Sequence, residues 1–498
     1  MNWTVPRSVA GALGVCIALC SSACSVPLGP GYRIVKESCE VHFVSRQSAQ
    51  LRIRADYTLQ NVGNSDLQFV DVALPGERDF GRVDLRVEVG GRETAPVNIP
   101  GENPEPNSLR IPLASSWTRK QSLELAVEYT FAAPANSGSR VTLDESDFHL
   151  DSRGWFPEFQ PAKGLLATYP NPPPVMEYTV RVPANFLVLA GGAPNGRKKD
   201  GGEIEYRFDL RAGKSTPYIV AGRYVVSAPE SRARSAIFWT TQPLKGDPAQ
   251  AADRIATAWQ TLGTDFGPPD QSGGKNIAVP HIVESAGLRG RLAGDPGPAA
   301  AAFPGGAIVN SEALALGTGS DQFVQIVTHA LARNWFGEVI YPSPQAAMGM
   351  GEGLPEYAAI LIDEARDGPD ARRRSVAGYL QRYDESLAGV EETPLAGVTA
   401  ADPVAQRRIA LAKAPLFFVA LEDTCGQAPM QKGIANLVAR MRGREVGYAD
   451  LRSALEETSN RNLAGMFRVW LNQKGIPGDF RTRYQGSAVG EVAEVAEK

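Results

Sequence analysis

The sequence predicts an α+β protein, in which an N-terminal antiparallel β-sandwich or saddle is followed by a mainly helical region. Between residues 32 and 227, several segments alternate apolar and polar side chains, which is typical of strands with one buried face. From about Ala236 onward, apolar residues recur with the period of amphipathic helices. At 498 residues the chain is also too long for one ordinary core, so we expect two or three domains.

The β-region is most clearly marked by the alternating segments 51–59, 123–131 and 176–182. Turn clusters such as Gly90-Gly91 and Asn195-Gly196 separate such segments, and the chain is rich in turn residues, with 37 prolines and 50 glycines. Short turns connect antiparallel neighbours, so these segments favour an antiparallel sandwich or saddle.

The second region begins with a helical pattern at residues 251–262, a strand-like run at 277–282 and a loop rich in Gly, Ala and Pro at 287–306. Beyond that loop, the periodicity predicts helices over residues 322–335, 353–365, 404–421, 430–441, 448–458 and 463–473. Gly475 and Pro477 end the last helix, and a frayed tail is expected from residue 485.

The composition is that of a soluble globular protein, with 43% hydrophobic and 21% charged residues. The net charge of -4 is small for this length. It gives no reason to expect nucleic acid or an anionic membrane surface as a partner.

The first 24 residues predict an export signal. Arg7 precedes a nearly continuous apolar stretch over residues 9–19, which is too short to span a bilayer with ease. The following Ser21-Ser22-Ala23-Cys24 resembles a bacterial lipoprotein box, although a bulky aliphatic residue is usual where Ser21 stands. We therefore expect an envelope protein, periplasmic or extracellular, tethered through acylated Cys24. Plain secretion and an uncleaved anchor are the alternatives.

Two of the five cysteines, Cys39 and Cys425, lie outside the signal and the tail. An exported location permits a disulfide between them. The alternative is two unpaired, buried thiols, and the sequence leaves this choice open.

The motif that bears on chemistry starts at His329. Zinc hydrolysis from a helix requires two histidines one turn apart, a glutamate base beside the first, and a third ligand from another helix. Here His329-Ala330-Leu331-Ala332-Arg333 is followed by Asn334-Trp335-Phe336-Gly337, and Glu352 lies nineteen positions after Arg333. The segment around Glu352 reads Gly351-Glu352-Gly353-Leu354-Pro355-Glu356-Tyr357.

These residues resemble the aminopeptidase N family of metallopeptidases, the M1 gluzincins. That family carries H-E-x-x-H-x-W-F-G and then W-L-N-E-G-F-A-x-Y. The likeness extends to residues 215–222, to Lys413 with residues 416–426, and to residues 470–477. It implies a saddle domain over residues 32–230, a thermolysin-like domain over 231–400 and its helical continuation over 401–484. The large C-terminal helical domain of full-length members has no counterpart.

The departures from the family pattern fall on the positions that carry chemistry. Arg333 stands at the second histidine, Ala330 at the general base, and Leu411 at the tyrosine that stabilises the transition state. Gly349 and Gly351 replace the Trp and Asn that precede the third ligand. The amine-binding G-x-M-E-N segment, expected between residues 277 and 308, is not recognisable.

Magnitudes argue against a working zinc site. Loss of a general base typically costs about 10²–10⁴-fold in rate. Two unit charges about 4 Å apart at an effective dielectric of about 20 repel by roughly 4 kcal/mol, and a divalent ion would be repelled by Arg333 about twice as strongly. The other histidines, His42, His149 and His281, are not spaced to repair the site. We therefore expect no zinc and no other cofactor.

Instead, the sequence predicts a salt bridge between Arg333 and Glu352, with His329 adjacent, because Glu352 needs a counter-charge in place of a metal. The alternative is an Arg333 that extends to solvent beside an exposed Glu352. Glu356 and Tyr357 complete the expected remnant of the cleft.

Three functions remain in view. The leading one is an exported, non-catalytic relative of these peptidases that binds a peptide or protein or organises an envelope complex, since a fold does not determine a function. The second is an active hydrolase with an unusual metal site or a metal-independent mechanism, although no G-x-S-x-G motif is present. The third is a structural lipoprotein with a filled cleft.

Overall fold

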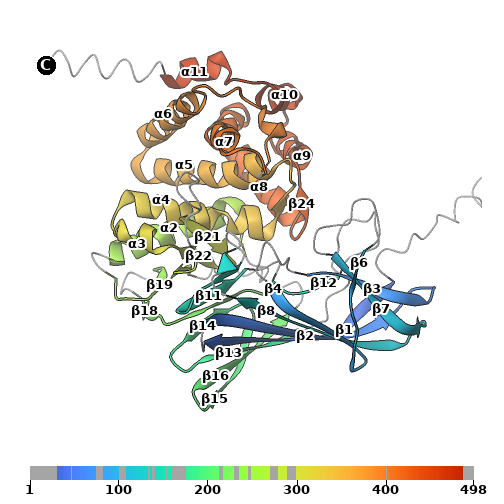
Figure 1. The fold of residues 1–498 in the computed structure, drawn as a ribbon. Coiled ribbons are helices and arrows are strands. Elements are labelled where there is room, and N and C mark those ends of the chain that lie inside the picture. The colour runs from blue at the N-terminus through green and yellow to red at the C-terminus, as the bar shows by residue number, and fades with distance from the viewer. Residues whose placement is uncertain are drawn as a thin grey trace, which may run out of the picture.

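The computed structural model shows a β-rich part and a helical part stacked on one another, blue to green below and yellow to red above in Figure 1. It describes residues 31–45, 48–74, 82–99, 108–132, 135–136, 141–151, 155–159, 175–211, 217–228, 235–244, 248–269, 279–288, 299–399 and 401–485. The predicted α+β class is confirmed. The expected export signal, Cys24 and nearly all of the expected tail lie outside the described residues.

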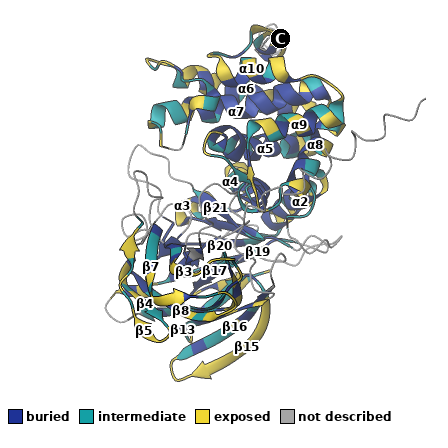
Figure 2. Cartoon of the chain, turned by 90° about the vertical axis from the view of Figure 1, so that its right-hand side faces the viewer, coloured by how far each residue is buried: buried dark blue, intermediate teal, exposed yellow. Residues whose placement is uncertain are grey.

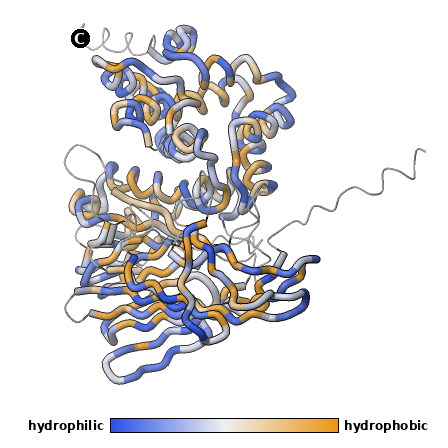
Figure 3. The backbone as a smooth tube through the Cα atoms, turned by 45° about the vertical axis from the view of Figure 1, so that its right-hand side comes forward, coloured by the Kyte–Doolittle hydropathy of each residue, from blue (hydrophilic) through white to orange (hydrophobic). Residues whose placement is uncertain are grey.

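The largest sheet of the β-rich part has eight strands. In spatial order they are β15 (Ala193–Asp200), β16 (Glu203–Arg211), β13 (Val175–Pro183), β1 (Tyr32–Ser45), β2 (Ala49–Asn61), β8 (Ser122–Ala132), β4 (Arg82–Val89) and β5 (Arg92–Glu93). Strand β2 shows why the sequence forms this sheet: its alternate residues, such as Leu51 and Ile53, are fully buried. Figure 3 shows this alternation as changing orange and blue along the strands.

One pairing differs from the antiparallel arrangement that we expected. Strands β1 and β13 run parallel, with Ser38 opposite Glu177, while the other pairs in the sheet are antiparallel. A parallel neighbour requires a long connection rather than a short turn, so turn residues could not reveal it. At one edge, β15 is exposed along its whole length (Figure 2).

Two smaller sheets complete the β-rich part. One contains β14 (Leu187–Ala190), β17 (Ile219–Gly222), β11 (Asp147–Leu150), β10 (Val141–Leu143) and β9 (Ala135–Asn136). The other contains β12 (Glu158–Phe159), β3 (Leu67–Ala73), β7 (Ser108–Trp117) and β6 (Val97–Asn98). One apolar core, which includes Trp155, Tyr129 and Phe148, is shared by residues of all three sheets.

A mixed sheet opens the second part. Its order is β18 (Val225–Ser227), β19 (Ile237–Thr240), β20 (His281–Glu284), β22 (Gly306–Val309) and β21 (Ala300–Phe303). The central pairs β19–β20 and β20–β22 are parallel, and both edge pairs are antiparallel. Strand β21 lies inside the segment 287–306 that was predicted to be a loop. The loop prediction is therefore partly wrong. Its Ala-rich sequence lacks the alternation that marks a half-buried strand, because all four residues are buried.

Helices pack with this sheet and enclose a second large core; one of them lies between β19 and β20 in the chain, and the others follow the sheet. The α-helices are α2 (Pro248–Phe266), α3 (Ser311–Ala315), α4 (Asp321–Ala332), α5 (Gly353–Asp367), α6 (Pro369–Ser386), α7 (Val404–Cys425), α8 (Gln427–Arg440), α9 (Tyr448–Ser459), α10 (Ala464–Asn472) and α11 (Gly478–Gln485). The π-helical turns η1 (Asn334–Val339) and η2 (Ala347–Glu352), the 3₁₀ turn η3 (Leu395–Gly397) and the short parallel strands β23 (Tyr341–Pro342) and β24 (Glu445–Val446) connect them. No helix in the described ranges has the length and apolarity that crossing a membrane would require.

The structure confirms the six helices predicted after the loop, with the end of the first shortened. Helix α4 stops at Ala332 and η1 takes over, whereas the prediction continued to residue 335. Helix α6 was missed because its sequence is strongly polar and carries only a weak apolar stripe, with Val376, Tyr379, Leu380 and Tyr383 buried.

Candidate functional site

Helix α4 places His329 and leads into Arg333. Ser320 caps its start by accepting a hydrogen bond from the Phe323 amide (3.1 Å). Its buried face includes Phe323, Val327 and Leu331, so His329 lies on a different side of the helix and keeps 21% of its side chain exposed.

The turn after α4 is anchored by Asn334. Its side-chain oxygen accepts from the Gly305 amide (3.0 Å), and its nitrogen donates to the Gly306 (3.0 Å) and Leu331 (3.1 Å) carbonyls. The neighbouring Trp335 donates to the Gly267 carbonyl (2.6 Å). The Asn334 bonds tie the end of α4 to the turn between β21 and β22, and the Trp335 bond ties it to the residue that follows Phe266. Together they hold the backbone next to Arg333 in place.

The opposite wall is formed by η2 and the start of α5, where two glycines have no room for a side chain. A Cβ at Gly349 would lie 1.8 Å from the Tyr448 hydroxyl oxygen, and a Cβ at Gly353 would lie 2.7 Å from that of Ala414. The Tyr448 side chain thus occupies the space beside Gly349, the position where the resembling family carries Trp. Tyr448 lies 99 residues further along the chain than Gly349, so the sequence around the motif does not point to it.

Four charged side chains meet between these walls and form the His329 cluster: His329, Arg333, Glu352 and Glu356. The Arg333 Nη1 donates to Glu352 Oε1 (2.8 Å), which confirms the predicted salt bridge. The His329 Nε2 lies 3.5 Å from Glu352 Oε2, and its Nδ1 lies 3.0 Å from Glu356 Oε1. The latter contact is an ion pair rather than an aligned hydrogen bond.

The two helices favour this arrangement of charges. His329 and Arg333 lie at the C-terminus of α4, the negative end of its dipole. Glu352 and Glu356 lie at the N-terminus of α5, the positive end of its dipole. Each charged group therefore lies near a side chain of opposite charge and at a helix end whose dipole stabilises it. Tyr379 of α6 adds a hydroxyl that donates to Glu356.

These contacts shift the pKa of three groups. Burial by itself would lower the pKa of His329, but Glu356 and Glu352 outweigh it and raise the value to about 9. Burial would raise the pKa of Glu356, yet His329 and Tyr379 lower it to about 2. The pKa of Glu352 is likewise held below its usual range, because Arg333 and His329 overcome the effect of burial. At neutral pH the cluster therefore contains two cations and two carboxylates.

The remaining predicted residues lie in different surroundings. Ala330 is 1% exposed and packs into the core, and Leu411 packs partly buried against the same core. Tyr357 is not part of the His329 cluster: it is fully buried, and its hydroxyl donates to Glu422 of α7 (2.9 Å). Within the described residues, no three His, Cys, Asp or Glu side chains are grouped as a metal site.

The strands before α4 bear on the missing amine-binding segment. Glu284 is the sole glutamate between residues 277 and 308. Its carboxylate accepts from the amide and hydroxyl of Thr241 (2.7 Å each) and from the Ser311 hydroxyl (2.8 Å), so it is committed within its own domain.

The other histidines and the cysteines also have defined places. His281 accepts from the Trp239 indole (3.0 Å), and His42 lies 3.0 Å from Glu203 in the eight-stranded sheet. His149 is fully buried in β11. Cys39 and Cys425 are both buried and unpaired, which decides between the two possibilities that the sequence left open.

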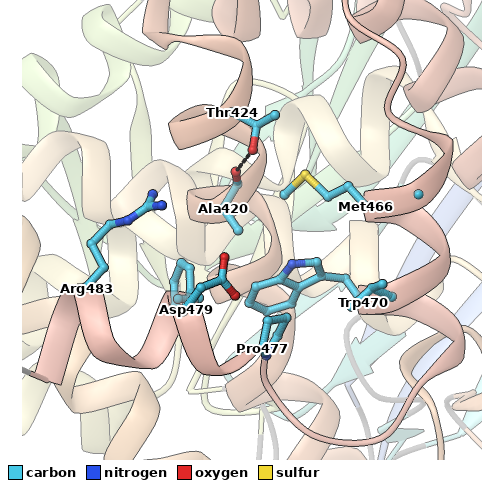
Figure 4. Close-up of a pocket in the computed structure, with 10 residues that line it drawn as sticks. Ala420, Thr424, Met466, Trp470, Pro477, Asp479 and Arg483 are labelled. Atoms are coloured by element: carbon cyan, nitrogen blue, oxygen red, sulfur yellow. Dashed lines mark hydrogen bonds between the residues drawn. The ribbon is translucent and has the colours of Figure 1, made fainter.

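A separate hollow of about 320 Å³ lies between α7, α10 and α11 (Figure 4). Trp470, Phe480 and Met466 provide apolar walls. Arg483 at its rim donates to Asp423 (2.6 Å), and no residue of the His329 cluster lines it.

Comparisons with known proteins show similarity at the level of the fold. No protein-family model and no curated protein matches the sequence. Among solved structures, the M1 zinc metallopeptidase from Deinococcus radiodurans is 17% identical, with a TM-score of 0.62 over 90% of this chain and 96% of that one. A mutant of that enzyme with a bound Tyr-Ser-Ala substrate gives the same values. A two-domain M1 zinc metallopeptidase mutant with bound L-arginine is 16% identical, with a TM-score of 0.63 and the same coverage.

Proposed function

Since this chain has the two-domain fold of the M1 zinc metallopeptidases, we propose that it is a non-catalytic protein on that scaffold and binds a peptide or protein near the His329 cluster. The observation that carries the proposal is the 2.8 Å contact between Arg333 and Glu352. A guanidinium stands where the fold's chemistry requires a metal ligand. The carboxylate that would bind the metal is already neutralised.

The residues present do not fit zinc. A catalytic zinc site takes three protein ligands and leaves a fourth position for water. Here the matching positions offer one imidazole, from His329, and one carboxylate, from Glu352. The third position is Arg333, whose guanidinium stays protonated and has no lone pair to donate. The base position, Ala330, also lacks a group that could take a proton from water.

The proposed binding of a peptide or protein is supported by the solvent exposure of the His329 cluster. The side chains of Glu352 and Glu356 are each 24% exposed, and that of Arg333 is 35% exposed, so a ligand can reach them. Such a cluster suits polar and charged parts of a peptide, because it offers donors and acceptors in alternation. Export and a tether through Cys24 belong to the same proposal, and they rest on the sequence of residues 1–24 alone.

Metal content and turnover test the non-catalytic part. Purified protein is dialysed against zinc, freed of loosely bound metal and analysed, and a fluorogenic aminopeptidase panel is run beside it. We expect far less than one zinc per chain and no chelator-sensitive turnover. Arg333→His restores the third ligand and should bind about one zinc, whereas the matched control Arg333→Gln removes the guanidinium without adding a ligand and should bind none.

An active metallopeptidase is the second candidate, and one observation favours it: His329 and Glu352 remain 3.5 Å apart, as two surviving ligand positions. Stoichiometric zinc in the unmodified protein, together with hydrolysis that a chelator abolishes, would establish this candidate and end the first. To test binding, an immobilised peptide library is probed with the unmodified protein and with Arg333→Glu. We expect a subset of peptides to bind only the former.

A further inference from the structure

A polar contact joins the two halves of the molecule at Asp147, a fully buried residue at the start of β11. Its Oδ2 accepts from the Ser285 hydroxyl (2.6 Å), and its Oδ1 accepts from the Ala286 amide (3.1 Å). Both partners follow β20 in the second half, 138 and 139 residues further along the chain. One carboxylate therefore holds two donors across the boundary.

The surroundings bring the two halves into close contact. Thr142 of β10 lies 3.2 Å from Ser285, hydroxyl to hydroxyl, and donates to it because the Ser285 proton is used by Asp147. A Cβ at Gly287 would lie 3.0 Å from that of Thr142. An apolar cluster continues the boundary, with Val220 and Tyr224 from the β-rich part and Val283 and Phe303 from the mixed sheet.

One residue at this boundary, His149, has polar side-chain atoms without a hydrogen-bond partner among the described residues. His149 lies directly opposite Thr142 across the β10–β11 pair, so both side chains point to the same face. It is fully buried, and among the described residues neither ring nitrogen has a hydrogen-bond partner. Burial lowers its pKa to about 3, so it remains neutral. An unpaired buried donor and acceptor cost free energy that water would return if the halves separated.

We infer that Asp147, Ser285 and the Ala286 amide form a latch, which holds the β-rich part and the peptidase-like part in one relative position and can release to let them hinge. The two charge-assisted hydrogen bonds stabilise the closed arrangement. His149, which lacks hydrogen-bond partners, destabilises the closed arrangement. The net free energy that holds the two halves together is therefore smaller than the buried area alone suggests. The inference does not depend on the proposed function, since it concerns the boundary rather than the His329 cluster.

Two neighbouring amides provide an internal test by hydrogen exchange. The Ala286 N–H donates across the boundary to Asp147, whereas the Ser285 N–H donates to the Val309 carbonyl (2.9 Å) inside the mixed sheet. In Ser285→Ala, we expect the exchange of the residue 286 amide to rise by about tenfold to hundredfold. The residue 285 amide should keep its rate, because its own strand stays folded.

A matched control removes a serine–carboxylate bond that does not cross the boundary. Ser311 donates to Glu284 (2.8 Å) within the second half, so Ser311→Ala should leave the Ala286 amide unchanged. A disulfide between Thr142→Cys and Gly287→Cys provides a second test. The two Cβ atoms would lie 3.0 Å apart, so the backbones must move apart by somewhat less than 1 Å to reach the usual disulfide spacing of about 3.8 Å. In the oxidised double variant, adding Ser285→Ala should no longer accelerate exchange at residue 286, and reduction should restore the effect.

Three outcomes would overturn the latch. Equal acceleration of both amides would mean local unfolding of the strand rather than hinging. Unchanged exchange in Ser285→Ala would mean that the contact restrains nothing. Acceleration at residue 286 by Ser285→Ala that persists in the oxidised double variant would mean that exchange there does not require the two halves to separate.

Discussion

The His329 cluster and the Asp147 latch differ in how far their charged and titratable side chains are buried. In the cluster, two cations face two carboxylates at helix ends that favour them, and each side chain keeps about a fifth to a third of its surface in water. At the latch, a carboxylate and an imidazole are fully buried, and the imidazole has no hydrogen-bond partner among the described residues. Burial, rather than the number of charges, therefore determines which region is sensitive to substitution.

The largest effect should come from Asp147→Ala. It removes the acceptor of the part-buried Ala286 amide and leaves the buried Ser285 hydroxyl with only the neutral Thr142 hydroxyl as a partner. Loss of a hydrogen bond to a charged group costs about 1.5–3 kcal/mol. We expect the free energy of unfolding in urea to fall by roughly 2–4 kcal/mol. A loss below that of Arg333→Ala would reverse the comparison between the two regions.

Gly349→Ala should be the next largest. The added methyl group meets the Tyr448 hydroxyl at the end of a rigid ring, and overpacking of this kind costs about 1–3 kcal/mol. Removing that oxygen in Gly349→Ala with Tyr448→Phe should recover part of the loss in thermal unfolding. Full stability of the single variant would show that Tyr448 moves aside easily.

The third effect appears only at acidic pH, where the buried Asp147 and His149 change the free energy of unfolding in opposite directions. Burial lowers the pKa of His149 to about 3, so this residue reduces stability as the pH falls below about 6.5. Burial raises the pKa of Asp147 to about 6 against the opposing Ser285 and Ala286 hydrogen bonds, so its contribution to stability grows as the pH falls through 6. The two trends oppose each other. Nearby Asp144 also raises the pKa of Asp147, and Tyr224 stays neutral in this range.

His149→Phe should unmask the Asp147 trend. Between pH 7 and pH 5, the variant should gain roughly 2 kcal/mol in the free energy of unfolding relative to the unmodified protein. The remaining histidines contribute to both proteins and cancel in the difference. Urea titrations at both pH values measure it, and parallel pH profiles for the two proteins would contradict a buried, neutral His149.

The smallest effect should come from Arg333→Ala. Its ion pair with Glu352 is about one third exposed on the arginine side, and such pairs contribute less than about 1 kcal/mol. Thermal unfolding should shift slightly, and the shift should shrink further at high salt because the charges are screened. A loss of several kcal/mol would mean that the cluster is as sensitive as the latch.

Much of the fold was predictable because its determinants are local. Alternation along β2 and helical periodicity in α4 and α9 are encoded in short stretches of sequence. The pairing of Arg333 with Glu352 was predictable for a related reason. Both residues flank helices that the motif spacing already places side by side.

By itself, the sequence determined the order of the two halves, most helices and the charges that meet at the end of α4. The tertiary structure alone decided the parallel β1–β13 pair, the approach of Tyr448 to Gly349, the bond from Tyr379 to Glu356 and the contact of Asp147 with Ser285. Local patterns specify which face of an element is buried. Which distant element covers that face depends on the packing of the whole chain, and no short segment of sequence records it.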